Sequence, residues 1–124
     1  MTVSKILHAP IPVVEAQVLA SLLRTLGDPT RLRILTALDT VCVPVTAIVE
    51  ATGIRQPTVS HHLRILRDRG LVRGERRGGY VFYCLATDAV RAALDVLQPL
   101  AASSDSGTAP LGDPSIPDSR RQDK

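Results

Sequence analysis

The sequence predicts a mainly α-helical domain that carries one small β hairpin, an α+β fold. Apolar residues recur at helical spacing in several segments, and two β-rich runs flank Gly78-Gly79. Arginines also gather late in the domain. The segment from Arg55 to Arg77 holds seven arginines and two acidic residues, a local net charge of +5. Positive charge concentrated in this way attracts phosphate groups, which points to a nucleic acid as the partner.

Length and composition allow a single domain. The chain has 124 residues, 44% of them hydrophobic, and a formal net charge of +3. Its only aromatic residues are Tyr80, Phe82 and Tyr83, so the core must be aliphatic and modest, and dimerisation would help to stabilise it. Two cysteines are too few for a disulfide scaffold, and their spacing fits no zinc finger. With neither a signal peptide nor a membrane span evident, we expect a soluble cytoplasmic protein.

The first half predicts two helices. Residues 1–12, with two prolines, predict a flexible arm, and the apolar spacing from Val14 to Leu26 predicts a helix that Gly27 ends. Asp28 can accept hydrogen bonds from the free amides of a new helix, and Pro29 fits its first turn. We expect the inward face of this second helix to consist of Leu32, Leu35 and Leu38.

The middle of the chain predicts a strand, two helices and a hairpin. Val41–Val43 is short and β-branched, and Pro44 separates it from a brief helix that runs to Ala51 before a turn at Gly53. A helix is then expected over residues 56–69, with Val59, Leu63 and Leu66 inward and Gly70 at its end. Two strands, residues 71–76 and 80–85, are joined by a turn in which the glycines supply positive φ angles.

The last part predicts a final helix and a tail. Helical periodicity returns from Thr87 and is expected to stop at Pro99, and residues 103–124 are rich in Pro, Ser, Gly and Asp, which predicts disorder. The order of elements is that of a winged helix-turn-helix domain over residues 13–102, with the hairpin as its wing.

Two motifs and the hairpin resemble a known family. LGDPTRLRILTAL, followed by QPTVSHHLRILRDRGLV and a glycine-tipped hairpin, is similar to the ArsR/SmtB family of bacterial metal-responsive repressors, from about Val13 to Leu97. The resemblance implies a homodimer joined through its first and last helices, operator binding by the helix that begins near Gln56, and control by an effector. Arg55 stands where the family usually has a serine cap.

The candidate DNA-binding residues fall on this helix and on the wing. Short polar groups at the helix start suit base edges in a major groove, and the arginines suit phosphate or the adjacent minor groove. Ser60, His61 and His62 could also be no more than a solvated helix face, and the flanking arginines favour the first interpretation. The predicted set is Arg55, Gln56, Thr58, Ser60, His61, His62, Arg64, Arg67, Arg73, Arg76, Arg77 and Tyr80.

The effector stays open, because most of the family's metal ligands are missing. Pro44 and Thr46 occupy the thiolate-rich positions, and the last helix offers only Asp88 and Asp95, so zinc is not expected there. A nickel or zinc ion could instead use ligands drawn from His8, Glu15, Cys42, Cys84 and Asp88. Pairing of the short strand with the last wing strand would bring the two thiols together as a redox switch or a partial soft-metal site. The alternative is that both cysteines are small buried hydrophobes.

Three functions follow from these observations. The first is a dimeric DNA-binding transcriptional regulator, a repressor that responds to a metal. The second is an accessory or redox-responsive winged-helix protein that needs a partner, or oxidation of Cys42 and Cys84, to control DNA binding. The third, an enzyme, is not expected, because the sequence has no phosphate-binding glycine loop and no carboxylate placed to orient a histidine.

Overall fold

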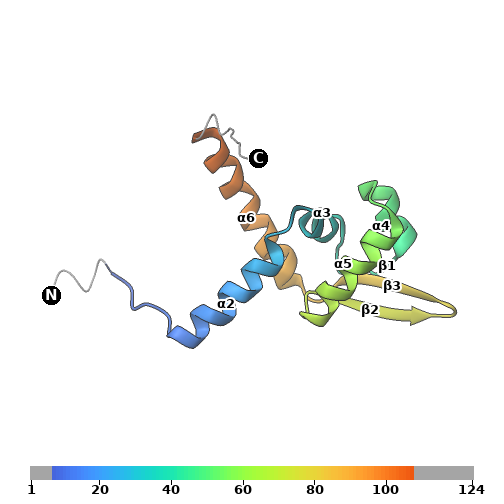
Figure 1. The fold of residues 1–124 in the computed structure, drawn as a ribbon, viewed down its shortest axis with the longest axis horizontal. Helices are drawn as coiled ribbons and strands as arrows, with labels where there is room; N and C mark the ends of the chain where they lie inside the picture. The colour runs from blue at the N-terminus through green and yellow to red at the C-terminus, as the bar shows by residue number, and fades with distance from the viewer. Residues whose placement is uncertain (1–6, 108–124) are drawn as a thin grey trace, which may run out of the picture. The chain divides into compact units, whose positions relative to one another are not determined.

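The computed structural model describes residues 7–107, with side chains described for residues 7–103. Its elements, shown in Figure 1, are α2 (Val13–Leu26), α3 (Pro29–Ala37), β1 (Val43–Pro44), α4 (Val45–Thr52), α5 (Gln56–Asp68), β2 (Val72–Arg77), β3 (Tyr80–Leu85) and α6 (Asp88–Gly107). The elements from α2 to β3 belong to one compact unit, and α6 belongs to a second. The predicted winged helix-turn-helix is confirmed, and residues 7–12 contain neither helix nor strand.

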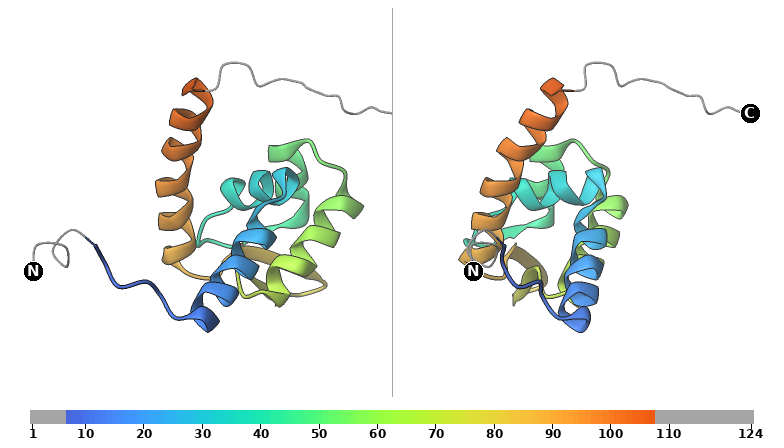
Figure 2. Two further views of the ribbon diagram at one scale, coloured as in Figure 1. Left: turned by 60° about the vertical axis from the view of Figure 1, so that its left-hand side comes forward. Right: turned by 90° about the vertical axis from the view of Figure 1, so that its left-hand side faces the viewer.

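Helices α3, α4 and α5 contact one another and surround an aliphatic core, and Figure 2 shows them gathered beside the hairpin. Leu35 and Leu38 are buried as expected, whereas Leu32 is half-buried. The inward face of α3 also includes Ile34, which the sequence prediction left out and which is fully buried. An isoleucine next to a leucine widens the apolar face, because consecutive helical residues point about 100° apart.

Caps and turns explain where the helices start and stop. Asp28 accepts hydrogen bonds from the backbone N–H groups of Thr30 (2.8 Å) and Arg31 (3.2 Å), so the predicted cap of α3 is confirmed. Gly53, at the end of α4, has a φ of 73°, in the left-handed region that favours glycine. The segment between α4 and α5 is therefore a tight turn, and it sets the angle between the two helices.

The sheet has the strand order β1-β3-β2, and both pairings are antiparallel. β2 and β3 form the wing, which extends beyond α4 and α5 in Figure 1. Arg77 pairs with Tyr80 across the two-residue turn. Of the two turn glycines only Gly78 has a positive φ, 62°, so the expectation that both would supply one is wrong. β1 begins at Val43 and includes Pro44, later than expected, since an edge strand tolerates a residue without an N–H.

Helix α6 does not end at Pro99, as the sequence suggested, but continues to Gly107. Proline removes one backbone hydrogen bond, yet Leu100, Ala101 and Ala102 after it favour helix, which lets the next turn form. Ser103–Gly107, expected to begin a disordered tail, are therefore helical, and residues 108–124 lie outside the described residues. None of the described helices is long and apolar enough to cross a membrane.

Candidate nucleic-acid interface

Helix α5 is anchored on one side and exposed on the other. Val59, Leu63 and Leu66 are fully buried, as the spacing predicted. The opposite side presents His61 and Arg64, both exposed. A helix held firmly by its apolar face and polar on its free face can be laid into a DNA major groove without losing its own packing.

The start of α5 offers backbone amides to an anion. The residue before it, Arg55, makes no side-chain cap, so the amides of the first turn are not satisfied by a capping oxygen. Arg55 itself is exposed beside them. Free helix-start amides together with a guanidinium form a favourable position for a phosphate group.

His62 is held by α3. Arg31 donates through Nε to His62 Nδ1 (3.2 Å) and through a second nitrogen to the backbone oxygen of Thr25 (3.1 Å). Burial keeps the pKa of His62 below its ordinary value of 6.5; the negative charge of Asp28 opposes this, and the positive charge of Arg31 adds a smaller lowering. His62 is thus a neutral acceptor that ties α5 to α3, a contact that joins residues 31 apart and left no sign in the sequence.

His61 differs from its neighbour. Its side chain is exposed, and its ring meets that of His62 edge-on, with the centroids 5.2 Å apart. Of the two histidines predicted to contact DNA, His61 is therefore free to reach outward, while one ring nitrogen of His62 already has a partner.

Two wing arginines are held by one carboxylate. Glu75 pairs with Arg77 (2.8 Å) and with Arg73 (2.5 Å), and the guanidinium of Arg77 also lies 4.6 Å from the centre of the Phe82 ring. The hydrogen bonds from Arg77 and Arg73 lower the pKa of Glu75. Sequence reasoning treated Glu75 only as a negative charge, although residues two apart on a strand share a face and the spacing could have revealed the cluster.

The other face of the wing carries Arg76. Strand alternation places it with Val72, which is buried at the root of β2, whereas Arg76 near the tip is exposed. In the described part of the chain, Arg76 takes part in no ion pair. Tyr80, across the turn, is 74% exposed. The wing tip therefore presents one unpaired cation and one aromatic side chain.

A groove of about 560 Å³ joins the wing to the start of α5. Gln56 and Ser60 line it from α5, and the other lining residues are Pro44, Val45, Thr46, Gly79, Tyr80, Val81, Phe82 and Tyr83. The structure thus brings two of the predicted base-contacting residues next to predicted wing residue Tyr80.

The metal-ligand candidates do not form a group of three or more in the described structure, and of the five only the two cysteines are shown in contact. His8 precedes α2, Glu15 lies in the first turn of α2, and Asp88 opens α6, all three exposed. Cys42 and Cys84 are bonded to each other, which confirms their predicted proximity but occupies both sulfur atoms. Among the side chains described, those of residues 7–103, no three His, Cys, Asp or Glu residues group to hold a metal.

Comparison with known proteins identifies the family. A family model described as a helix-turn-helix domain matches residues 26–75. The regulator NmtR of Mycobacterium tuberculosis is 45% identical over 87 residues, which span 70% of this chain and 72% of that protein. The chain belongs to the ArsR/SmtB family of winged helix-turn-helix transcriptional regulators. A biofilm growth-associated repressor of Agrobacterium fabrum is 36% identical over 90 residues, 71% of this chain and 77% of that protein.

Solved structures agree. A domain from Mycobacterium bovis, described as a homodimeric winged helix-turn-helix DNA-binding domain of a possible ArsR-family regulator, matches with a TM-score of 0.61 at 30% identity, over 77% of this chain and 91% of that one. NolR of Sinorhizobium fredii matches with a TM-score of 0.63 at 29% identity, over 75% and 96%. This ArsR/SmtB regulator is a DNA-binding transcription factor and not an enzyme.

Proposed function

We propose that this regulator is a dimeric repressor that places the start of α5 in the major groove of its operator and lays the wing along the flanking backbone. The observation that carries the proposal is the anchoring of α5 through three fully buried residues, which leaves His61 and Arg64 exposed on its free face. Gln56, Thr58, Ser60 and His61 then face base edges, and Arg55, Arg64 and Arg67 face phosphates.

The wing supplies the second part of the interface. Arg76 and Tyr80 contact the backbone or the neighbouring minor groove, and Arg73 and Arg77 approach it in the geometry that Glu75 imposes. His62 positions α5 through Arg31 rather than contacting a base, because its Nδ1 already accepts a hydrogen bond.

Two helices carry the surface that we assign to dimerisation. On α2 the exposed apolar residues are Val13, Val14, Val18, Leu19 and Leu23, and on α6 they are Val96, Leu97 and Leu100. Each of the two helices thus has an exposed apolar face of its own, and soluble proteins seldom leave such faces uncovered, which supports pairing of two copies through these helices. A twofold dimer reads an inverted repeat, and since its ligand is genomic DNA we place its action in the cytoplasm.

The test is fluorescence anisotropy with two duplexes, one from the region upstream of the protein's own gene and one of scrambled sequence. His61→Ala should reduce the preference for the first duplex by about 1 to 3 kcal/mol, since one base hydrogen bond is worth about 0.5 to 1.5 kcal/mol and the dimer has two copies. His8→Ala removes an exposed histidine outside α5 and the wing and is the matched control. Equal, weak binding of both duplexes by the wild-type protein would refute the proposal and favour an accessory protein that needs a partner.

A further inference from the structure

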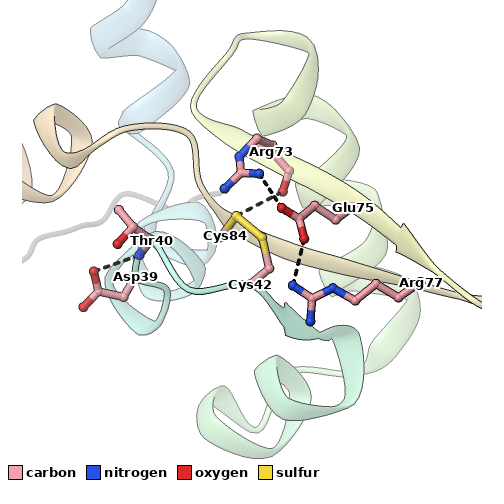
Figure 3. The surroundings of a disulfide bond; sticks show 7 residues. All are labelled: Asp39, Thr40, Cys42, Arg73, Glu75, Arg77 and Cys84. Atoms are coloured by element: carbon pink, nitrogen blue, oxygen red, sulfur yellow. Dashed lines mark hydrogen bonds and ion pairs between the residues drawn. A yellow bond between two sulfur atoms is a disulfide. The ribbon is translucent and has the colours of Figure 1, made fainter.

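The two cysteines lie opposite each other at the root of the wing. β1 pairs with β3 through Val43–Tyr83 and Pro44–Phe82, so Cys42, the residue before β1, falls opposite Cys84. Their Cα atoms are 4.2 Å apart and their sulfur atoms are bonded, as Figure 3 shows. The fold itself therefore holds the two thiols within bonding reach, although 42 residues separate them in the sequence.

The two cysteine residues differ in exposure. Cys84 is fully buried, whereas Cys42 is 8% exposed and follows Val41, which is 76% exposed. A reagent that arrives from solvent meets Cys42 first, and Cys84 can then react with it from the interior. Cys42 is thus placed to react with the oxidant, and Cys84 is placed to resolve the oxidised sulfur by forming the disulfide.

The strand pairing next to the two cysteines is short. β1 has two residues, and Pro44 has no N–H to donate to β3. One more hydrogen bond, from the N–H of Leu85 to the backbone oxygen of Asp39 (2.8 Å), ties β3 to the segment before β1. A covalent bond between Cys42 and Cys84 therefore reinforces a pairing of only two residues.

The bonded cysteines lie beside residues that we assign to DNA binding. Cys84 is the cross-strand partner of Arg73, and its sulfur lies 3.9 Å from the Arg73 backbone oxygen. Cross-strand partners point to the same face, so the bonded pair shares a face with the Arg73–Glu75–Arg77 cluster, as Figure 3 shows. Pro44, which pairs with β3, lines the groove that also contains Gln56 and Ser60 of α5. The spacing of β1 and β3 thus helps to set where the wing lies relative to α5.

We propose that Cys42 and Cys84 form a reversible thiol–disulfide switch that clamps the wing to the helix-turn-helix. Hydrogen peroxide oxidises the Cys42 thiolate: the sulfur bonds to one peroxide oxygen, the O–O bond breaks, and the other oxygen leaves as hydroxide, which takes up the proton that Cys42 released and becomes water. The Cys84 thiol then attacks the Cys42 sulfur, and the added oxygen leaves as a second water. The two cysteines together lose two electrons, and one peroxide is reduced to two waters. A small dithiol reverses the bond by two exchange steps and is itself oxidised to a disulfide.

The effect on DNA rests on the proposed function. With the bond formed, the wing and α5 are already held in the arrangement described, so less conformational freedom is lost when DNA binds. The oxidised protein should bind the upstream duplex about threefold to tenfold more tightly than the reduced protein.

The first part of the test does not use DNA. Wild-type protein is treated with hydrogen peroxide or with dithiothreitol and is then denatured and alkylated. We expect no alkylated cysteine after peroxide, two after dithiothreitol, and a monomer on a non-reducing gel in both cases. Hydrogen exchange in peptides covering residues 39–45 and 80–85 should be at least about threefold slower in the oxidised protein, because the bond suppresses local opening of the β1–β3 pairing. Two free thiols after peroxide, a disulfide between chains, or equal exchange in both forms would overturn the switch.

The second part measures anisotropy on the upstream duplex in both redox forms. Cys42→Ser keeps nearly the same volume but cannot form the bond, so its affinity should be the same after either treatment and equal to that of the reduced wild-type protein. Cys42→Ala serves as a second variant if the serine protein does not fold. Equal affinity of the two wild-type forms, or tighter binding by the reduced form, would refute the clamp. Absence of selective binding in both forms would instead count against the proposed function, while the exchange data still decide the switch.

Discussion

Replacing Arg76 by alanine should make DNA binding less sensitive to salt without changing which DNA is preferred. Of the seven arginines between residues 55 and 77, three already have side-chain partners: Arg69 donates to Ser21, and Arg73 and Arg77 pair with Glu75. The described structure gives no such partner to the other four, Arg55, Arg64, Arg67 and Arg76. If three of these reach phosphates in each protomer, the dimer makes about six contacts, and log affinity against log salt should have a slope of about −5.

Loss of Arg76 removes one contact from each protomer and should bring the slope to about −4. The assay is anisotropy on the upstream and scrambled duplexes between about 50 and 300 mM NaCl, with affinity falling by the same factor on both. Arg24→Ala, an exposed arginine on α2, is the matched control and should leave the slope unchanged. A flat salt response in the wild-type protein, or a loss confined to one duplex, would refute the assignment of Arg76 to phosphate.

Four further predictions concern stability and positioning. Leu63→Ala should lower the free energy of unfolding in urea by about 2 to 5 kcal/mol because the side chain is fully buried, whereas Arg64→Ala next to it should change stability by less than about 0.5 kcal/mol yet weaken DNA binding. The lowered pKa of His62 means that the unfolded chain takes up a proton first as the pH falls through about 6.5, so unfolding free energy should decrease there, and His62→Gln should flatten that dependence. Glu75→Gln should steepen the salt slope while reducing discrimination, since it raises the positive charge but releases Arg73 and Arg77; an unchanged slope would contradict this. Deletion of residues 108–124 should leave melting temperature and DNA affinity unchanged, and a large fall in either would show that these residues are needed.

Local signals in the sequence were enough for most of the fold. The cap at Asp28, the turn at Gly53 and the apolar spacing of α5 each depend on neighbouring residues, so each could be predicted and each was confirmed. The end of α6 could not, because a proline interrupts the hydrogen bonding of a helix without always terminating it, and the residues that follow Pro99 favour helix. The start of β1 was misplaced for a related reason: only pairing with β3 decides which residues of a short segment form a strand.

The sequence was enough to predict which elements carry the exposed polar residues, but not which side chains contact one another. Charge and helix spacing located the exposed residues of α5 and the wing, but the contact of Arg31 with His62 depends on how α3 packs against α5. A contact between residues 31 apart has no periodicity to reveal it. The consequence is specific, because two adjacent histidines that look equivalent in the sequence have different roles: His61 is exposed, while His62 is an acceptor for Arg31.

The net charge of the Arg55–Arg77 segment is larger than the number of its arginines that are free to bind phosphate. An arginine already paired with a carboxylate has given up part of its hydration and its freedom, so it gains less from DNA but needs less ordering when it binds. The wing combines both kinds, with Arg73 and Arg77 fixed by Glu75 on one face and Arg76 unpaired on the other. In the interface that we propose, Glu75 lowers the general attraction to nucleic acid and fixes the positions from which Arg73 and Arg77 approach DNA. An acidic residue within a DNA-binding wing is consistent with this role, since a repressor gains more from discrimination between sequences than from tight binding to any DNA.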